Sequence, residues 1–290
     1  MKIAFASGKG GTGKTTIAVN LAYFLARSNQ QVQYLDCDVE EPNGHLFLKP
    51  EFQTKAPTNV MIPVIDQNKC TFCGKCSSHC QFNALVTLPE NVLVFPELCH
   101  GCGLCVRICP EGAINEGERA IGFIEKGKGI EGIDFVHGVL NVGEPMAVPI
   151  IHEVNRQQKN QHIRIIDAPP GTSCPVVKTI QNVDVVVMVT EPTPFGLHDL
   201  KIAVSVAQNL GIPIGVVINR ENGEFLPLTA YLSKNNLPVL MVMPEDMEIA
   251  RHYSQGELLV EALPQYMDQF MELSVNIGKL LGRSKMQVVQ

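Results

Sequence analysis

The sequence lacks three features that would direct it to nucleic acid, to a membrane or to secretion. It has no Lys/Arg-rich run and a formal net charge of -6, so it offers no basic face to nucleic-acid phosphates. No apolar stretch approaches the ~20 residues of a membrane-spanning helix. The apolar run at residues 2–6 gives way to a Gly/Lys loop before a signal-peptide core could form. We therefore expect a cytoplasmic protein that does not bind nucleic acid.

Cysteine, by contrast, is plentiful and unevenly spread. Eight of the ten cysteines fall into two regular clusters. A chain of 290 residues without a secretion signal does not need disulfides to stabilise a small core. Regular cysteine clusters in such a chain indicate metal binding first.

Outside the cysteine clusters, short apolar runs alternate with helical patterns. The runs have the length of buried strands and occupy residues 2–6, 32–35, 163–166, 183–189, 214–218 and 239–242. One helical period begins at Thr15, and another covers 200–210 and ends at Gly211. This alternation predicts a doubly wound α/β domain, whose parallel sheet is covered by helices on both faces.

One segment breaks this alternation and contains an internal repeat. Between residues 60 and 115 the composition shifts to Cys, Gly and Pro, and residues 70–85 match residues 99–114 at an offset of 29. We expect an α/β domain made of residues 1–59 and 116–290, with residues 60–115 inserted as a separate α+β domain.

A phosphate-binding loop follows the first predicted strand. Residues 8–15 fit G-x-x-x-x-G-K-[ST], in which backbone N–H groups and the following helix N-terminus surround phosphates. Lys14 is expected to neutralise the β- and γ-phosphates of ATP, and the Thr15 hydroxyl to bind Mg²⁺. The predicted nucleotide-binding residues of the loop are Gly8, Gly10, Gly11, Thr12, Gly13, Lys14, Thr15 and Thr16.

The two cysteine clusters share the spacing C-x₂-C-x₂-C-x₃-C. This spacing resembles that of bacterial two-cluster ferredoxins, in which the fourth cysteine of each run serves the other 4Fe–4S cluster. The resemblance implies one ligand set of Cys70, Cys73, Cys76 and Cys109 and a second of Cys80, Cys99, Cys102 and Cys105. Gln81 follows Cys80 where ferredoxins have proline, but ligation does not need that proline. Zinc would need only paired C-x₂-C knuckles and is the minor alternative.

The phosphate loop itself resembles the deviant Walker A motif of the MinD/ParA/Mrp superfamily, because it has a second lysine, Lys9, inside the pattern, in the run KGGTGKT. The resemblance implies an ATP-dependent dimer in which Lys9 acts on the partner's phosphates; the alternative is a solvated loop lysine. It also implies that Asp38 orients the attacking water and that Asp36 supports Mg²⁺. Residues 38–43 and 190–200 resemble other stretches of these proteins.

Four further site residues follow from the same resemblance. Asp167, at the end of an apolar strand, is expected to hold the Mg²⁺ shell, and Gly171 to sense the γ-phosphate. Asn219 resembles an adenine-reading asparagine, and Pro244 lies where backbone packs on the base. For Asn219 and Pro244, an ordinary strand-end loop explains the residues equally well.

Two cysteines remain outside the clusters. Cys37 is expected to pack in the interior. Cys174 follows Asp167 at a spacing similar to that of a cluster cysteine in the nitrogenase iron protein. However, residues 116–173 contain no cysteine, and the C-terminal C-x-x-C of Mrp-type carriers is missing. We therefore expect packing for Cys174 as well.

These features predict a slow ATPase, stimulated by a dimer partner or another protein, with ATP, Mg²⁺ and two 4Fe–4S clusters. The expected partners are a second copy or a related ATPase, and a redox or cluster-acceptor protein. The first hypothesis is nucleotide-gated electron transfer, because the insert begins soon after Asp38 and ends ahead of Asp167. The alternative is ATP-dependent assembly or delivery of iron–sulfur clusters.

A third hypothesis is MinD-like positioning at a membrane through an amphipathic C-terminus. Apolar residues share one helical face there, with basic residues nearby: Phe270, Leu273, Ile277, Leu280 and Leu281, with Lys279, Arg283 and Lys285. A terminal helix packed on the sheet explains the same pattern more simply, so we do not expect membrane contact.

Overall fold

The computed structural model describes residues 1–157, 159 and 162–282. Within these residues a nine-stranded sheet has the order β11-β10-β9-β1-β8-β2-β7-β6-β3. The strands from β11 to β7 are parallel to one another, which confirms the predicted parallel α/β fold. Their bounds are β1 Lys2–Ala6, β2 Val32–Asp36, β7 Asp134–Leu140, β8 Ile163–Asp167, β9 Val185–Thr190, β10 Ile214–Glu221 and β11 Val239–Pro244.

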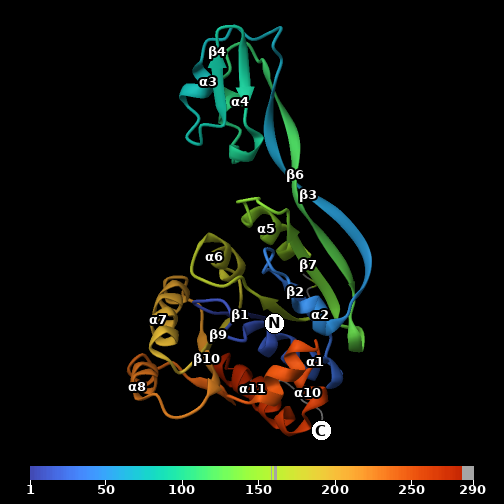
Figure 1. The fold of residues 1–290 in the computed structure, drawn as a ribbon, viewed down its shortest axis with the longest axis vertical. Coiled ribbons are helices and arrows are strands. Elements are labelled where there is room, and N and C mark those ends of the chain that lie inside the picture. The colour runs from blue at the N-terminus through green and yellow to red at the C-terminus, as the bar shows by residue number, and fades with distance from the viewer. Residues whose placement is uncertain (158, 160–161, 283–290) are drawn as a thin grey trace.

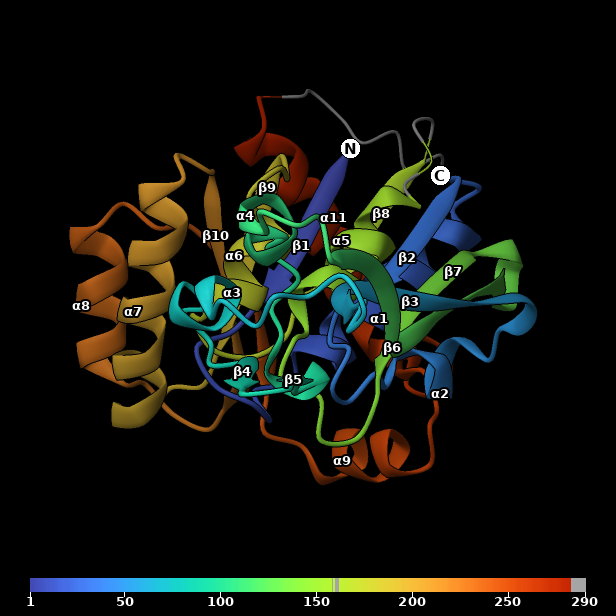
Figure 2. The ribbon, with the colours of Figure 1, turned by 90° about the horizontal axis from the view of Figure 1, so that it is seen from above.

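Helices cover both faces of this sheet (Figures 1 and 2). One face carries α1 (Lys14–Arg27), α10 (Leu259–Ala262) and α11 (Met267–Leu280), and the other carries α5 (Val148–Arg156), α6 (Cys174–Ile180), α7 (Pro194–Asn209) and α8 (Leu226–Lys234). The strands supply both cores because successive side chains point to opposite faces. In β1, Ile3 and Phe5 enter the first core, whereas Ala4 and Ala6 enter the second.

Shorter elements connect these layers. They are α2 (Gly44–Leu48), η2 (Ile130–Gly132), α9 (Met247–Ser254) and η3 (Pro264–Tyr266). Of these, α2 follows the loop after β2, where the predicted residues Asp36 and Asp38 lie, and α9 lies beside the carboxyl end of β11.

Two antiparallel strands at one edge of the sheet were not predicted. They are β3 (Glu51–Ile65) and β6 (Ile114–Lys128), and they pair along their length. Residues 122–128 of β6 also pair with β7, so this half belongs to the sheet. Beyond a β-bulge at Ile121, residues 59–65 and 114–120 continue as a two-stranded extension, which we call the ribbon (Figure 1). The expected domain boundaries at 59/60 and 115/116 fall inside these strands.

The ribbon carries residues 66–113, which we call the cysteine module, at its far end. The module is displaced from the sheet on the side of α5 and α6 (Figures 1 and 2). It comprises α3 (Lys75–Ser78), the hairpin β4 (Leu85–Leu88) and β5 (Asn91–Val94), η1 (Pro96–Leu98) and α4 (Leu104–Ile108). Every residue of the module is described, and its buried residues are Ala84, Leu85, Val92, Cys99 and Ala113. Its apolar core is therefore very small.

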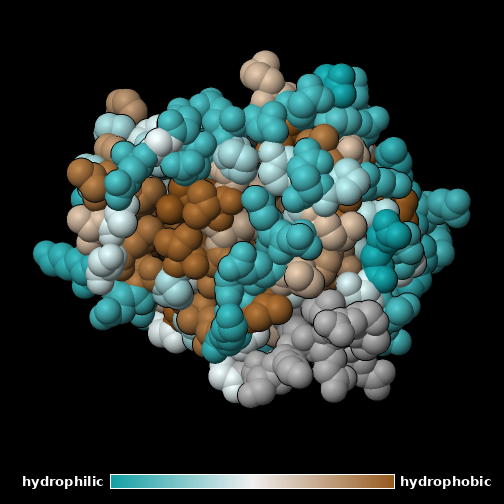
Figure 3. Space-filling model, turned by 90° about the horizontal axis from the view of Figure 1, so that it is seen from below, coloured by the Kyte–Doolittle hydropathy of each residue, from teal (hydrophilic) through white to brown (hydrophobic). Residues whose placement is uncertain are grey.

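The last described helix packs on the sheet. In α11, Phe270, Leu273 and Ile277 are fully buried, and Asn276 Nδ2 donates to the Leu240 carbonyl at 3.0 Å. Arg283 and Lys285, expected near its polar face, lie outside the described residues. Figure 3 shows the side opposite the module, where an apolar area is visible on the left.

Among the described residues, no helix combines the length and apolarity required to cross a bilayer. The expected cytoplasmic location stays a prediction.

Candidate functional site

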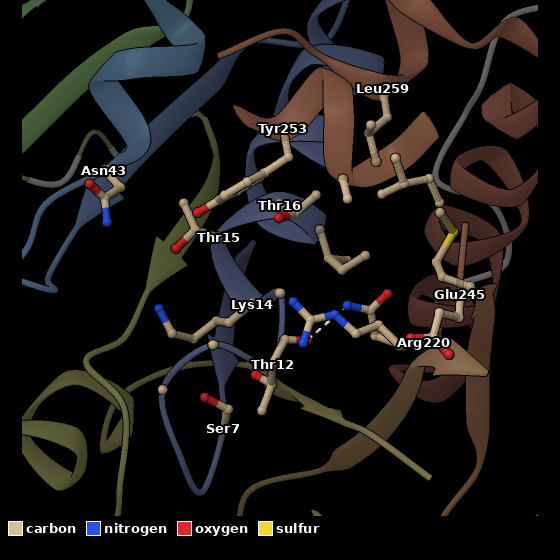
Figure 4. Close-up of a pocket in the computed structure, with 18 of the residues that line it drawn as sticks. Ser7, Thr12, Lys14, Thr15, Thr16, Asn43, Arg220, Glu245, Tyr253 and Leu259 are labelled. Atoms are coloured by element: carbon tan, nitrogen blue, oxygen red, sulfur yellow. Dashed lines mark hydrogen bonds between the residues drawn. The ribbon is translucent and has the colours of Figure 1, made fainter. Parts of the chain in front are cut away.

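The predicted phosphate loop joins β1 to α1 and forms one wall of a pocket of about 520 Å³. Figure 4 shows Lys14 and Thr15 on one side of this pocket and Glu245 on the opposite side. Gly13 has a φ of 87°, and a Cβ there would come within 2.2 Å of Asn219 Nδ2. Glycine is thus required at this position both by the backbone conformation and by the approach of Asn219.

The predicted nucleotide-binding residues divide into two groups. Most of them line the pocket: Gly10, Gly11, Thr12, Gly13, Lys14, Thr15, Thr16, Asn219 and Pro244. Gly8 does not, because it packs against α7, and a Cβ there would meet the Asp199 carbonyl oxygen at 2.4 Å. Glycine at position 8 is therefore explained by close packing, and Gly8 is not part of the pocket lining.

Asp167 lies at the centre of a buried polar cluster at the ends of β8 and β2. Its Oδ1 accepts a hydrogen bond from Lys14 Nζ at 2.5 Å, and its Oδ2 accepts from Thr15 Oγ1 at 2.6 Å. Tyr34, which was not predicted, donates its hydroxyl proton to Oδ2 at 3.0 Å. Tyr34 lies in β2, where every residue is buried. In the sequence, only its hydroxyl group distinguishes it from the apolar residues beside it.

Thr15 and Asp167 have the oxygen ligands that Mg²⁺ prefers, and Lys14 supplies a positive charge beside them. Burial opposes the charge of Lys14, but Asp167 and then Asp38 hold its pKa above the ordinary value of 10.5. The site therefore keeps a charged lysine in a buried position, as phosphate binding requires.

The other two predicted carboxylates are held differently. Asp36 is fully buried and accepts backbone N–H bonds from Asp38 at 3.1 Å and Gly44 at 2.9 Å, which ties α2 to the end of β2. Asp38 lies 3.8 Å from Lys14 and keeps 17% of its side chain exposed. Burial raises the pKa of Asp38 to about 6; Lys14 opposes this shift and Asp167 adds to it.

Lys9 contacts its own chain in this structure. Its Nζ lies 2.8 Å from Glu191 Oε2, while Arg220 Nη1 donates to Glu191 Oε1 at 2.6 Å. Glu191 thus holds two cations beside the phosphate loop. The sequence analysis assigned no role to Glu191 or Arg220, although Glu191 lies in a stretch that carried the family resemblance.

The residues predicted to contact the base come from segments distant in sequence from the phosphate loop. Asn219 Nδ2 donates to the Thr12 carbonyl at 2.8 Å, so it braces the phosphate loop. Pro244 lines the same pocket, as does Tyr253. The Gly171 N–H donates to the Ser7 carbonyl at 3.0 Å, which places the loop after β8 beside the phosphate loop.

The eight clustered cysteines line two small hollows in the module. One hollow is lined by Cys70, Cys73, Cys76 and Cys109, together with Ile65 and Ile114. The other is lined by Cys80, Cys99, Cys102 and Cys105, together with Met61 and with Cys76, which lines both hollows. Each hollow thus includes three cysteines of one repeat and the last cysteine of the other.

The two repeats also position their sulfurs in matching ways. Backbone N–H groups donate to Cys70 Sγ from Phe72 at 3.4 Å and to Cys99 Sγ from Gly101 at 3.5 Å. The fourth cysteines match as well, since Ala84 donates to Cys80 Sγ and Ala113 to Cys109 Sγ, both at 3.3 Å. Backbone N–H groups in such positions orient the sulfur atoms that they contact.

Across the described residues, no three His, Cys, Asp or Glu side chains converge on one metal-ion position. The remaining two cysteines lie apart from the hollows. Cys37 is fully buried, and burial raises the pKa of its thiol well above the ordinary value, whereas Cys174 is exposed at the start of α6.

Comparisons with known proteins agree with this geometry. The CobQ/CobB/MinD/ParA nucleotide-binding domain family matches residues 3–260. An uncharacterized protein of Methanocaldococcus jannaschii is 32% identical over 270 residues, covering 89% of this chain and 90% of the relative. An iron–sulfur cluster carrier protein of Rickettsia typhi is 25% identical over 276 residues, covering 93% of this chain and 69% of the carrier.

Among solved structures, the septum site-determining protein MinD of Pyrococcus horikoshii, complexed with Mg-ADP, has the same fold. Its TM-score is 0.60 at 19% identity, with 97% of each chain covered. The family match covers most of the chain, and the phosphate loop lines a pocket in the described structure. The chain therefore belongs to the CobQ/CobB/MinD/ParA nucleotide-binding family and is a MinD/ParA-like P-loop ATPase.

Proposed function

We propose that this ATPase carries two 4Fe–4S clusters in its cysteine module and uses ATP-dependent dimer closure to control electron transfer to a partner protein. The observation that carries the proposal is the placement of the eight cysteines around two hollows, each of whose linings contains one crossed set of four, with Cys76 shared by both linings. When bound, Mg²⁺ neutralises phosphate charge, and the clusters accept and donate single electrons.

In the nucleotide pocket, Lys14, Thr15 and Asp167 would hold the phosphates and Mg²⁺, with Asp36 as a buried support. Asp38 would orient the attacking water, because it is the half-buried carboxylate nearest Lys14 that still reaches solvent. Lys9 would act on a partner's phosphates after exchanging its contact with Glu191. The dimer would form with a second copy or with a related ATPase.

Crossed ligation favours electron transfer over delivery. Because each hollow takes its fourth cysteine from the other repeat, releasing either cluster would require the two halves of the module to separate. A permanent cluster pair suits a relay of electrons.

A second candidate, iron–sulfur cluster delivery, is favoured by one specific observation: relatives named as iron–sulfur cluster carriers match along most of this chain. Exposed Cys73 and Cys102 would provide access for an acceptor. Chelator treatment of the loaded protein separates the candidates. A permanent module keeps its iron for hours, whereas a carrier loses iron at once and faster with Mg-ATP.

The direct test is the reduction potential of the anaerobically purified protein with and without Mg-ATP. For a one-electron couple, a shift of ~59 mV corresponds to a tenfold change in equilibrium. We expect a shift of at least that size. Unchanged potentials would remove energetic coupling between nucleotide and clusters and leave cluster delivery as the better account.

A further inference from the structure

The base of the ribbon is held by the loop between β7 and α5, residues 141–147, which we call the clamp loop. Three consecutive residues of β6 bond to it. Arg119 donates to both carboxylate oxygens of Glu144, with Nη2 to Oε1 at 3.4 Å and Nη1 to Oε2. Asn141 Nδ2 donates to the Ala120 carbonyl at 3.1 Å, and Asn141 N–H donates to the Ile121 carbonyl at 2.9 Å.

The ion pair in this contact is shielded from water. The Glu144 side chain is 4% exposed and the Arg119 side chain 18% exposed. Glu144 Oε1 also accepts from the Met146 N–H at 3.2 Å, which fixes the carboxylate within its own loop. Removing either charge would leave the other one buried and unpaired, which is destabilising. The Arg119–Glu144 pair is therefore held in one geometry.

The clamp loop directly follows β7, and the end of β7 contacts the segment after Asp38. The Leu140 N–H, at the end of β7, donates to the Val39 carbonyl at 2.8 Å. Val39 is 1% exposed and directly follows Asp38, whose carboxylate lies near Lys14. A Cβ on Gly138 would come within 2.9 Å of Val39 Cγ1, so β7 and Val39 are packed without spare room.

Side-chain packing also connects Val39 to the base of the ribbon. Val39 and the bulge residue Ile121 are both buried in the core beneath α5, together with Ile150. Because densely packed interiors transmit displacements instead of absorbing them, a shift of Val39 would reach both β7 and the ribbon base.

From these contacts we infer that the clamp loop transmits the nucleotide state to the cysteine module, with Arg119 and Glu144 as positioning residues that set the angle of the ribbon. A change at Asp38 and Val39 on ATP binding moves the end of β7, and Glu144 then moves Arg119. Coupling of this kind requires different contacts in the two nucleotide states. This inference rests on the proposed function only in its consequence for the clusters.

Hydrogen exchange read by mass spectrometry tests it on the iron-loaded full chain, with Mg-ADP and with Mg-ATPγS. In the wild type, exchange of residues 59–65 and 114–120 differs at least ~5-fold between the two nucleotides, the lower end of ordinary coupling. In Glu144→Gln that difference disappears, while nucleotide affinity stays within ~2-fold because Glu144 lies outside the pocket.

Glu118→Gln is the matched control, since exposed Glu118 bonds Asn59 across the ribbon at 2.6 Å. It keeps the wild-type response. Arg119→Lys, which retains charge but not the two-point contact, gives a reduced response and covers the case in which Glu144→Gln does not fold. A full nucleotide response in Glu144→Gln or Arg119→Lys would overturn the inference, as would an absent response in the wild type.

Failure of this inference and failure of the proposed function give different results. A nucleotide-dependent reduction potential with no ribbon response overturns the clamp loop's role and leaves gated electron transfer standing. A ribbon response that depends on Glu144, combined with unchanged potentials, supports the clamp loop and overturns the gating.

Discussion

The nucleotide pocket and the cysteine module place their reactive groups in opposite physical settings. Asp36 and Asp167 lie beside the pocket, whose lining includes Asp38, and are fully buried at strand ends that are anchored in cores on both faces of the sheet. In the module, whose residues are all described, only five are buried, and Cys73 and Cys102 are exposed. The pocket is supported by the fold around it, whereas the module has little apolar packing to support its cysteines.

This difference explains what each region needs from its ligand. Lys14, Thr15 and Tyr34 satisfy Asp167 with three hydrogen bonds, so we expect the pocket to keep its shape when nucleotide is removed. For the module we expect a metal core to be required, because so few buried side chains cannot offset the conformational entropy lost on folding. Predictions that separate the two regions therefore test the comparison itself.

The largest expected effect is the loss of the module's structure on iron removal. After anaerobic chelation, amide exchange in residues 66–113 should rise at least ~100-fold, because binding energy of such sites is folding energy. Exchange in β1 and β8 should stay unchanged, and removing nucleotide from the iron-loaded protein should leave the module protected. Retained protection in the iron-free module would break the comparison.

Crossed ligation makes a stepwise prediction about iron content. Cys109→Ser should lose about half of the iron, since that cysteine lines the hollow of the first repeat. The double variant Cys70→Ser/Cys109→Ser should lose no more, whereas Cys70→Ser/Cys80→Ser should lose nearly all. Cys174→Ser, outside both hollows, is the control and should keep full iron. The reverse result for the two double variants would mean that the fourth cysteines are not exchanged.

Asp38 gives a prediction confined to the pocket. Its pKa in the folded protein is about 6, above the ordinary 3.8, so ionising it costs folded-state stability as pH rises through this interval. Asp38→Asn should therefore stabilise the nucleotide-free protein by ~1–3 kcal/mol at pH 8, with a smaller gain at pH 5.5. ATP hydrolysis should nevertheless fall at least ~100-fold.

Denaturant unfolding at the two pH values measures the stability change. Exposed Glu40 provides the control, and Glu40→Gln should change stability by less than ~0.5 kcal/mol. Equal stability of Asp38→Asn and wild type at pH 8 would show that Asp38 carries no burial penalty.

The smallest effect concerns the brace on the phosphate loop. Asn219→Ala removes the 2.8 Å bond to the Thr12 carbonyl, worth about 1 kcal/mol, so ADP should bind about 5-fold more weakly. Asn235→Ala, whose amide bonds Tyr231 on α8, should leave affinity unchanged in titration calorimetry. Equal affinities for both variants would remove Asn219 from the binding account.

Much of the nucleotide-binding half could be predicted because its signals are local. Apolar runs located the parallel strands, and glycine spacing located the phosphate loop between β1 and α1. The Lys9–Glu191 contact could not be predicted, since it joins segments far apart in sequence and depends on loop conformation.

The ribbon escaped prediction for a related physical reason. Its pairing joins β3 to β6 across the whole cysteine module. Its sequence contains polar residues and Pro63, and Pro57 precedes it in β3, which together mask a strand pattern. The grouping of cysteines into two hollows, in contrast, resembles the ligand sets that the likeness of the repeat to two-cluster ferredoxins implies.

The most direct test of the central claim is the iron and acid-labile sulfide content of the anaerobically purified wild-type chain. Two 4Fe–4S clusters predict about eight iron and about eight sulfide per chain. Zinc in place of iron, or iron without sulfide, would contradict the account and make the cysteine module a structural metal site.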